Sequence, residues 1–285
     1  MNTVLITGAN SGLGFETARR LAAAGRPVIL ACRNHDRAEA ALEKILDESP
    51  NAQVTTLALD TSSLKSVRAA VDSLSGVKLA GLINNAGISP LHDGKTPDGF
   101  ELVFATNYLG HFLLTLLLLP QLTPTARIVN VTSDMHNPPG GITWPGVEHL
   151  AHPSKVDRRK YAYSKLANLY FTYALARRLK AQGSKITVNA FNPGMMQTNF
   201  APATRTKEEV DEIKRRMPDR IGDLDTSADT LAEMMTKPSL SKRSGAYVDR
   251  DRGVARSSEL SYDERNQEEL WEASLRFTGM ETLDE

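Results

Sequence analysis

The sequence of 285 residues has little of what several function classes require. It contains one cysteine, Cys32, which excludes an intramolecular disulfide or a thiolate zinc cluster and indicates a reducing compartment. The six histidines are scattered without an HExxH arrangement, so no metal site is expected. The 34 basic and 34 acidic side chains cancel, so no overall field attracts nucleic acid or an anionic membrane.

Long apolar runs and linkers are also missing. The most apolar run, residues 112–119, has about half or less of the length that a membrane-spanning helix needs, so we expect a buried helix and no membrane partner. No basic and apolar leader precedes the strand-like residues 3–6, and a cytoplasmic location is expected. Because no linker rich in Gly, Ser or Pro divides the chain, we expect one domain over residues 1–285.

Short runs rich in Val, Ile and Leu alternate with amphipathic stretches. The runs are typical of strands buried on both faces, and they lie at residues 4–7, 28–31, 54–59, 79–83, 128–131 and 186–191. Helical periodicity occurs between and after them, at residues 12–24, 36–48, 64–74, 107–118 and 160–180. This alternation predicts an α/β fold with a doubly wound parallel sheet and helices on both faces.

Two segments interrupt the alternation. Residues 134–159 form an insertion rich in Pro and Gly, and residues 195–223 form a polar stretch with helical character. Long irregular insertions in compact α/β chains tend to carry function, so the second segment is expected on the substrate side. After it we expect a helix at residues 226–235, a last strand at 245–248 and a closing helix at 266–277.

A glycine-rich turn, TGANSGLG at residues 7–14, joins the first expected strand to the first helix. Glycines let the backbone approach a pyrophosphate closely, and the N–H groups at a helix start favour an anion. A tight turn without a ligand is the alternative, but strand, turn and helix stand in the order that dinucleotide sites require. The expected cofactor contacts in this turn are Gly8, Asn10, Ser11, Gly12, Leu13 and Gly14.

A tyrosine and a lysine four residues apart are candidates for acid–base chemistry. Tyr161 and Lys165 share a helix face, so the ammonium is expected to stabilise the phenolate and to bring a pKa of about 10 toward neutrality. Ser133 ends the fifth expected strand, where open α/β sheets bind ligands, and its hydroxyl is expected to hold a carbonyl oxygen. A surface tyrosine and a serine that caps the strand end are the alternatives.

The residues after the second expected strand bear on cofactor choice. Dinucleotide folds hold a ribose 2′-hydroxyl with an acidic residue at this place, whereas an arginine accepts a 2′-phosphate. The sequence has Arg33 and Asn34 there, so NADP(H) is the expected cofactor. The alternative is that Arg33 pairs with Asp36 on the surface.

The glycine spacing and several later motifs resemble the short-chain dehydrogenase/reductase family. After TGxxxGxG come NNAG at residues 84–87, Asn107 at the start of a helix, Ser133, YxxxK at residues 161–165, and Pro193 and Gly194 before Thr198. Their order agrees with the family from Asn2 to about Gly279. The resemblance implies a single Rossmann-fold domain.

The resemblance also implies chemistry for these residues. In the family a ketone or aldehyde is reduced, or an alcohol oxidised, by a catalytic set that corresponds to Asn107, Ser133, Tyr161 and Lys165. The tyrosine donates a proton, the lysine also holds the nicotinamide ribose, and the asparagine completes a proton relay. Further cofactor contacts are implied at Asp60, Thr61, Asn85, Ala86, Gly87, Tyr161, Lys165, Pro193, Gly194 and Thr198.

Residues 99–101, 106–112, 164–168 and 256–259 resemble the branch of retinol dehydrogenases and light-dependent protochlorophyllide reductases. That branch implies a bulky apolar carbonyl substrate or a ring double bond. The pigment reductases carry cysteines around their pocket, and membrane-bound retinol dehydrogenases usually have a leading apolar segment; the sequence shows neither. A soluble NADPH-dependent carbonyl reductase is therefore expected. A non-catalytic NADP(H)-binding sensor or scaffold and a protochlorophyllide-type double-bond reductase are the alternatives.

The pocket and the assembly stay open. Trp144, Met195, Met196 and Phe200 either line an apolar pocket or pack as ordinary loop residues. In the family, the helices that begin near Asn107 and Tyr161 commonly form a dimer face, to which Leu114, Leu117, Leu118 and Tyr170 would be suited. A long segment before Tyr161 can also cover that face, so the sequence leaves monomer and homodimer undecided. The expected partner is a small carbonyl or alcohol substrate.

Overall fold

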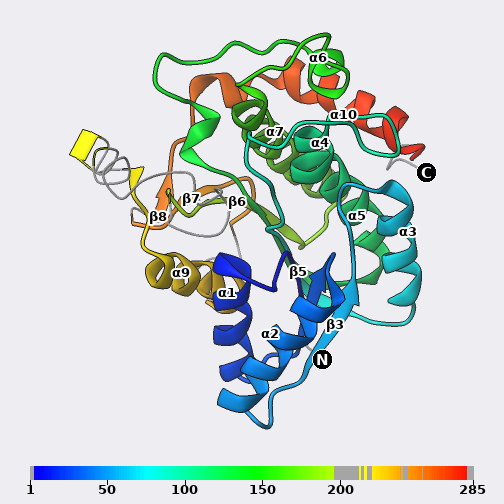
Figure 1. The fold of residues 1–285 in the computed structure, drawn as a ribbon, viewed down its shortest axis with the longest axis vertical. Helices are drawn as coiled ribbons and strands as arrows, with labels where there is room; N and C mark the ends of the chain where they lie inside the picture. Colours follow the sequence, from blue (N-terminus) through cyan, green and yellow to red (C-terminus); the bar gives the residue numbers. More distant parts are fainter. Residues whose placement is uncertain are drawn as a thin grey trace.

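The strands of the computed structural model form one sheet in the order β3-β2-β1-β4-β5-β6-β7-β8 (Figure 1). The structure describes residues 3–195, 212, 215–216, 220–237, 239, 243–251 and 253–280. The strands are β1 (Thr3–Thr7), β2 (Val28–Cys32), β3 (Val54–Ala58), β4 (Leu79–Asn84), β5 (Leu122–Val131), β6 (Thr187–Asn192), β7 (Tyr247–Asp249) and β8 (Gly253–Ala255). Strands β1 to β7 pair in parallel, and β8 pairs antiparallel with β7.

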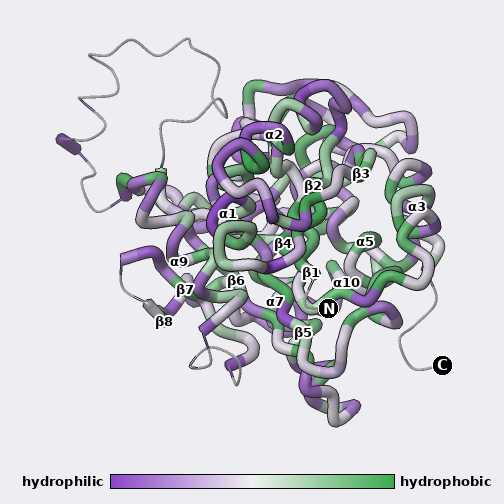
Figure 2. Tube along the Cα trace, turned by 90° about the horizontal axis from the view of Figure 1, so that it is seen from below, coloured by the Kyte–Doolittle hydropathy of each residue, from purple (hydrophilic) through white to green (hydrophobic). Residues whose placement is uncertain are grey.

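Each face of the sheet carries its own hydrophobic core. In β1, Val4 and Ile6 belong to one core and Leu5 to the other, as the two-residue period of a strand requires. Figure 2 shows β2, whose five residues are all buried, in the colour of hydrophobic residues. The continuous apolar runs therefore arise because both faces of the parallel strands are covered.

Three helices cover each face. On one face lie α1 (Gly12–Ala23), α2 (His35–Glu48) and α9 (Leu224–Thr236). On the other lie α3 (Leu64–Ser73), α5 (Gly110–Leu118) and α7 (Lys160–Ala181). These helices confirm the predicted Rossmann fold, in which the C-terminal ends of the parallel strands form one edge of the sheet.

A long apolar helix crosses the second core. It consists of α4 (Leu102–Phe104), the π-helical turn η1 (Ala105–Leu109), α5 and the 3₁₀ turn η2 (Leu119–Gln121). With 20 residues and a mean hydropathy of 1.8 it is long and apolar enough to cross a membrane, but 83% of its most apolar stretch is buried inside the fold. The helix expected at residues 107–118 was thus too short at both ends, whereas the assignment of the apolar run at residues 112–119 to a buried helix is correct.

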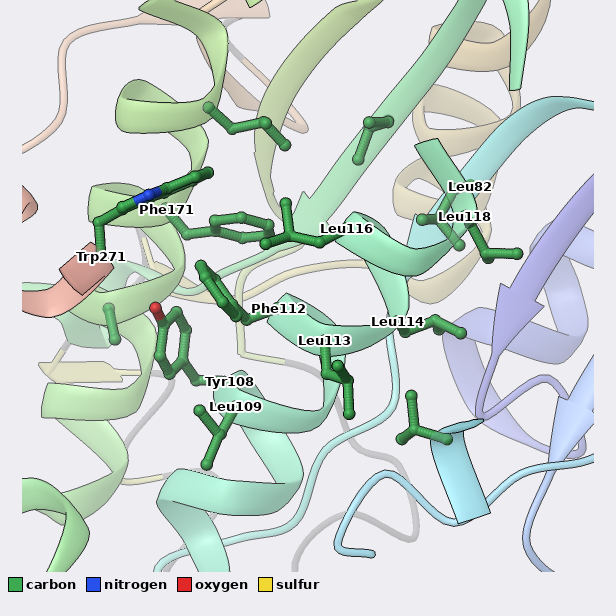
Figure 3. Packing of buried hydrophobic residues seen from close by; sticks show 14 of the residues in the cluster. Leu82, Tyr108, Leu109, Phe112, Leu113, Leu114, Leu116, Leu118, Phe171 and Trp271 are labelled. Atoms are coloured by element: carbon green, nitrogen blue, oxygen red, sulfur yellow. The ribbon is translucent and has the colours of Figure 1, made fainter. Parts of the chain in front are cut away.

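The closing helix α10 (Glu264–Thr278) packs over α5 and α7. Figure 3 shows Trp271 of α10 beside Phe112 and Phe171, and the rings of Trp271 and Phe112 meet edge to face at 5.2 Å. The hydroxyls of Tyr108 and Ser274 share a hydrogen bond of 2.7 Å. Of the residues suggested for a dimer face, Leu114, Leu118 and Tyr170 are buried within the chain and Leu117 is partly buried.

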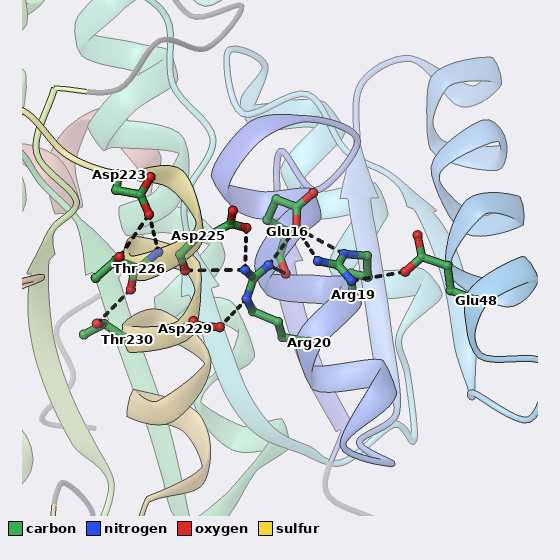
Figure 4. Close-up of polar contacts among 9 residues, drawn as sticks. All are labelled: Glu16, Arg19, Arg20, Glu48, Asp223, Asp225, Thr226, Asp229 and Thr230. Carbon is green, nitrogen blue, oxygen red and sulfur yellow. Dashed lines mark hydrogen bonds and ion pairs between the residues drawn. The ribbon is translucent and has the colours of Figure 1, made fainter.

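Helices α1 and α9 lie side by side and are joined by charge (Figure 4). The guanidinium of Arg20 lies 2.6 Å from the Glu16 carboxylate and 2.7 Å from that of Asp225, and it also pairs with Asp229. These carboxylates hold the pKa of Arg20 above its ordinary value despite the opposing effect of burial. Since Ser227 of α9 donates to the Pro193 carbonyl at 2.9 Å, this pairing also supports the loop after β6.

Several short elements were not predicted. The insertion at residues 134–159 contains the 3₁₀ turn η3 (Asp134–His136) and the short helix α6 (Val147–Ala151), and η6 (Glu259–Tyr262) precedes α10. Strand β8 is three residues long and mostly exposed, so it carries no two-residue pattern. Strand β5 begins at Leu122, ahead of the expected start at residue 128. The prediction placed the start too late because most of the residues from 123 to 127 are not apolar. Most of the expected segment 195–223 lies outside the described residues.

Candidate active site

The glycine turn has the shape of a phosphate cradle. Gly8 has a φ of +65°, and a Cβ on Gly14 would lie 2.5 Å from the Gly8 carbonyl oxygen and 2.6 Å from Asn85 Nδ2. Ser11, the N-cap residue of α1, makes no side-chain cap hydrogen bond, whereas Asn34 caps α2 through its side chain. The first-turn amides of α1 thus lack a side-chain acceptor from their N-cap. The turn therefore fits the pyrophosphate of a dinucleotide.

Asn85 and Thr7 hold this turn against the end of β4. Asn85 Nδ2 donates to the Thr7 carbonyl at 2.8 Å, and the backbone amides of Asn85 and Ala86 both donate to Thr7 Oγ1 at 2.9 Å. Ala86 also lies against Gly8, because a Cβ added to Gly8 would lie 2.9 Å from the Ala86 Cα. The predicted contact residues Asn85 and Ala86 therefore shape the turn, and Gly87 follows them directly.

The ends of β2 and β3 meet beside the same turn. Arg33 is exposed, and the described residues show no ion pair between it and Asp36. Asn34 Oδ1 accepts from the Arg37 amide at 2.9 Å, so the oxygen of this predicted cofactor contact serves as a helix cap. Asp60 Oδ1 accepts from the Ser62 amide and hydroxyl, at 2.9 and 2.6 Å.

Two buried residues, Cys32 and Thr61, connect the ends of β2 and β3 to the glycine turn and to α5. The Cys32 thiol accepts hydrogen bonds from the amides of Ala9 and Asn10, and burial raises its pKa to about 11. Thr61 is buried beneath α5, where a Cβ on Gly110 would lie 2.0 Å from the Thr61 carbonyl oxygen. Gly110 therefore permits the close approach of α5 to the end of β3.

Ser133 and Tyr161 meet at the C-terminal end of β5. Their side chains are joined by a hydrogen bond. Ser133 Oγ also accepts from the Met135 amide at 3.1 Å and lies 3.2 Å from Asp134 Oδ1. Ser133 thus caps η3, and it contacts the candidate acid as well.

Lys165 lies beneath the ring of Tyr161. Its Nζ is 5.5 Å from the ring centroid and donates to the Val131 carbonyl at 3.1 Å. Burial lowers the pKa of Lys165 to about 8 and raises the pKa of Tyr161 above its ordinary value of 10.0. The expected shift of the Tyr161 pKa toward neutrality is therefore not seen in this structure, in which burial raises the pKa and the Ser133 side chain opposes the rise. A protonated tyrosine suits proton donation.

Asn107 joins α7 to the loop after β4. It lies in the π-helical turn η1, a geometry that often marks functional sites. Its Oδ1 accepts from the Ile88 amide at 2.8 Å, and its Nδ2 donates to Ser164 Oγ at 3.1 Å. Ser164 in turn donates to the Tyr161 carbonyl at 2.8 Å, so Asn107 reaches Tyr161 through a single side chain.

His111 was missed from the sequence although it stands one helical turn after Asn107. Its Nε2 is 2.9 Å from Thr7 Oγ1, and its Nδ1 is 3.2 Å from the Asn107 carbonyl oxygen. Because a carbonyl only accepts, Nδ1 carries the proton and Thr7 donates to Nε2. The imidazole therefore connects the glycine turn to Asn107, and through Ser164 to Tyr161.

This burial gives a prediction for acid stability. Desolvation lowers the pKa of His111 from 6.5 to about 4. Between these pH values the His111 imidazole binds a proton in the unfolded chain but not in the folded chain. The free energy of unfolding should therefore fall by about 3 kcal/mol as the pH drops from 7 to 4. His111→Gln should lack this part of the decrease in urea titrations. The exposed His35, replaced by Gln, is the control, and equal pH slopes for all three proteins would contradict the assignment.

Pro193 and Gly194 lie at the end of β6. Gly194 has a φ of +73°, and its amide donates to Asn192 Oδ1 at 3.1 Å. The same oxygen accepts from the Asp134 amide at 3.0 Å, which connects this loop to Ser133. Thr198, Met196 and Phe200 lie outside the described residues, so their predicted contacts have no placement.

Comparisons with known proteins agree with this geometry. A family model described as short chain dehydrogenase matches residues 2–144. Retinol dehydrogenase 13 of Homo sapiens is 37% identical over 98% of this chain and 85% of that protein. Short-chain dehydrogenase TIC 32 A, chloroplastic, of Brassica napus is 36% identical over 96% of this chain and 88% of that protein. The chain belongs to the short-chain dehydrogenase/reductase family. Within it, the chain lies in the retinol dehydrogenase-like branch, which confirms the resemblance seen in the sequence.

Solved structures of the family support the same assignment. An uncharacterized protein from Mycobacterium Paratuberculosis aligns with a TM-score of 0.77 and 35% identity, over 99% of this chain and 94% of that one. A short chain dehydrogenase from Burkholderia cenocepacia J2315 in complex with NADP aligns with a TM-score of 0.69 and 27% identity, over 87% and 95%. As a family member with an intact cradle, the chain binds a nicotinamide dinucleotide, NAD(P).

Trp144 packs within the insertion before α7. Its ring meets that of Tyr170 edge to face at 5.0 Å, and its Nε1 donates to Glu269 at 2.7 Å. Trp144 therefore packs the insertion against α7 and α10. Of the two alternatives for this residue, a pocket lining or ordinary loop packing, the structure agrees with loop packing.

Proposed function

We propose that the chain is an NADPH-dependent oxidoreductase that reduces a ketone or aldehyde to an alcohol, with Tyr161 as general acid. The observation that carries this proposal is the hydrogen-bonded pair of Tyr161 and Ser133, which stands above the buried Lys165. Both hydroxyls lie at the C-terminal end of β5, where open α/β sheets bind their ligands.

Each residue of the catalytic set has a separate task. The hydride for the carbonyl carbon would come from a nicotinamide held in the site. Ser133 donates a hydrogen bond to the carbonyl oxygen, and Tyr161 donates the proton that completes the alcohol. The Lys165 ammonium stabilises the charge left on Tyr161, and with a pKa of about 8 it is mostly protonated at neutral pH. Asn107 holds Ser164 and α7 in place and completes the path by which Tyr161 regains a proton.

We propose the cofactor contacts that the family resemblance implies, and the geometry of the turn supports part of them. Gly8, Gly12 and Gly14 would form the backbone around the pyrophosphate with Asn10, Ser11 and Leu13. Gly8 and Gly12 have positive φ, and Gly14 lies against Gly8 and Asn85. Lys165 would hold the nicotinamide ribose, while Asp60 and Thr61 would border the adenine. Pro193 and Gly194 would lie at the nicotinamide end.

We propose NADP(H) over NAD(H) because Arg33 is exposed and forms no ion pair with Asp36 within the described part of the chain. Its guanidinium is therefore available to a 2′-phosphate. Arg33→Glu should raise the KM for NADPH by about 10-fold or more, since a charge-assisted hydrogen bond is lost and a repulsion added. Arg158→Glu makes the same change of charge at another exposed position and should leave this KM within twofold. An unchanged KM in Arg33→Glu would contradict the assignment.

The substrate proposed is bulky and apolar. This follows from the branch, whose members in the comparison include Polyprenol dehydrogenase of Danio rerio, 36% identical over 97% of this chain and 86% of that protein. The names of this relative and of retinol dehydrogenase 13 point to long isoprenoid alcohols and their carbonyl counterparts. The same class is proposed for this chain.

A direct test follows absorbance of the reduced nicotinamide with NADPH or NADH and a panel of bulky aldehydes, ketones and diones. Consumption of NADPH with little of NADH supports both the reaction and the role of Arg33. Preference for NADH overturns the cofactor choice alone. No consumption with either, despite tight binding, would favour a non-catalytic sensor, and light-dependent conversion of a tetrapyrrole would favour the double-bond reductase.

The surroundings of the enzyme are proposed on similar grounds. Because α10 covers α5 and α7, we propose that the chain does not dimerise through that face, although another face stays open to a homodimer. The burial of the long apolar helix supports a role without a membrane partner. The buried free thiol of Cys32 suits a reducing compartment, and the cytoplasm is the proposed location.

A further inference from the structure

His136 is a buried residue to which the proposed chemistry gives no task. Its side chain is 5% exposed. Nδ1 lies 2.7 Å from the Ser133 carbonyl oxygen, and Nε2 lies 3.1 Å from the backbone nitrogen of Ser258. Since a carbonyl only accepts and an amide N–H only donates, Nδ1 carries the proton and Nε2 the lone pair. One neutral imidazole thus bridges Ser133 to the segment before α10.

Both ends of this bridge are fixed by further contacts. The His136 amide also donates to the Ser133 carbonyl at 3.0 Å, and the ring meets that of Tyr247 edge to face at 5.5 Å. At the other end, Ser257 Oγ lies 2.6 Å from the hydroxyl of Tyr173, a residue of α7. The segment is therefore attached both to the catalytic helix and, through His136, to the catalytic serine.

We propose that His136 is a positioning residue that makes the orientation of Ser133 depend on the docking of residues 256–262. This inference rests on the proposed function, in which the Ser133 hydroxyl holds the carbonyl oxygen. The carbonyl that His136 binds and the hydroxyl that meets Tyr161 belong to the same residue, so a rotation of the Ser133 backbone would turn its hydroxyl away. Displacements of about 1 Å at a reacting group can cost 100-fold in rate.

Ser258 offers a matched pair of variants, because only its backbone amide takes part in the bridge. Ser258→Pro removes the N–H and retains the backbone, since Ser258 has a φ of −64° and proline requires about −65°. Ser258→Ala retains the N–H and removes a hydroxyl that has no hydrogen-bond partner among the described residues. His136→Phe keeps a ring against Tyr247 while it deletes both hydrogen bonds.

In the full-length enzyme, Ser258→Pro and His136→Phe should each lower kcat about 10-fold or more, with the KM for NADPH within twofold of wild type. Ser258→Ala should retain kcat within twofold. A purely structural role would instead lower the active fraction, which titration of NADPH sites measures, and leave kcat per site unchanged. Wild-type kcat in either bridge variant would overturn the proposal.

Hydrogen–deuterium exchange tests the bridge without turnover. In His136→Phe, amides of residues 256–262 and of residues 132–137 should both exchange at least 10-fold faster, while those of β1 and β4 keep their rates. Faster exchange in only one of the two segments would overturn the coupling. If the wild type turned over no carbonyl, the proposed function would fail, and the joint rise in exchange would still decide whether His136 links the two segments.

Discussion

Tyr161→Phe is expected to lower kcat by about 1,000-fold and to leave NADPH affinity within twofold. Burial holds the pKa of Tyr161 above its ordinary value, so the hydroxyl is protonated at neutral pH, and it interacts with the Ser133 side chain. Phenylalanine keeps the ring above Lys165, whose Nζ lies 5.5 Å from the centroid, but it has no proton to give. Single-turnover absorbance measures the loss, and fluorescence titration of NADPH measures the binding.

Tyr163→Phe is the matched control for this variant. Tyr163 lies on the same helix and is 5% exposed, but its ring packs against His149 at 6.4 Å and lies outside the Ser133 pair. Its kcat should stay within twofold of wild type. If Tyr161→Phe turned over at the wild-type rate, Tyr161 would not be the acid, and a water or another side chain would have to supply the proton.

Gly14→Ala is expected to weaken NADPH binding by about 100-fold or more and to lower the free energy of unfolding by about 3 kcal/mol. The added Cβ would lie 2.5 Å from the Gly8 carbonyl oxygen and 2.6 Å from Asn85 Nδ2. Both atoms belong to the cradle, so the turn must open or Asn85 must leave the Thr7 carbonyl. Calorimetric titration with NADPH and urea unfolding report the two effects separately.

Gly25→Ala separates this clash from the general cost of losing a glycine. Gly25 has a φ of +72° and no heavy atom within 4 Å of the Cβ position, so its replacement should cost about 1 kcal/mol through the backbone alone and leave NADPH binding intact. Gly14 shows no such positive φ, and its cost comes from contact. Normal affinity and stability in Gly14→Ala would show that the cradle can open without loss.

Much of the fold could be predicted because its signals are local. Most of the strands β1 to β6 are short runs rich in Val, Ile and Leu, because both faces of the central parallel strands are buried, and these runs located β1 to β6 to within a few residues, apart from the start of β5. The turn at residues 7–14 could be recognised because the close approach of two backbones admits only glycine at Gly14. The four-residue spacing of Tyr161 and Lys165 placed both on one helix face by the helical period alone.

What the sequence determined by itself was therefore the family, the sheet and the residue types at the site. The state of those residues depended on burial and on partners far along the chain. Desolvation reversed the expected direction of the Tyr161 pKa, and His111 reaches Thr7 across 104 positions. Likewise Trp271 of α10 meets Phe112 of α5, and Ser258 meets His136 across 122 positions. Periodicity and spacing report contacts within one element, whereas electrostatics and long-range hydrogen bonds exist only once the elements have packed.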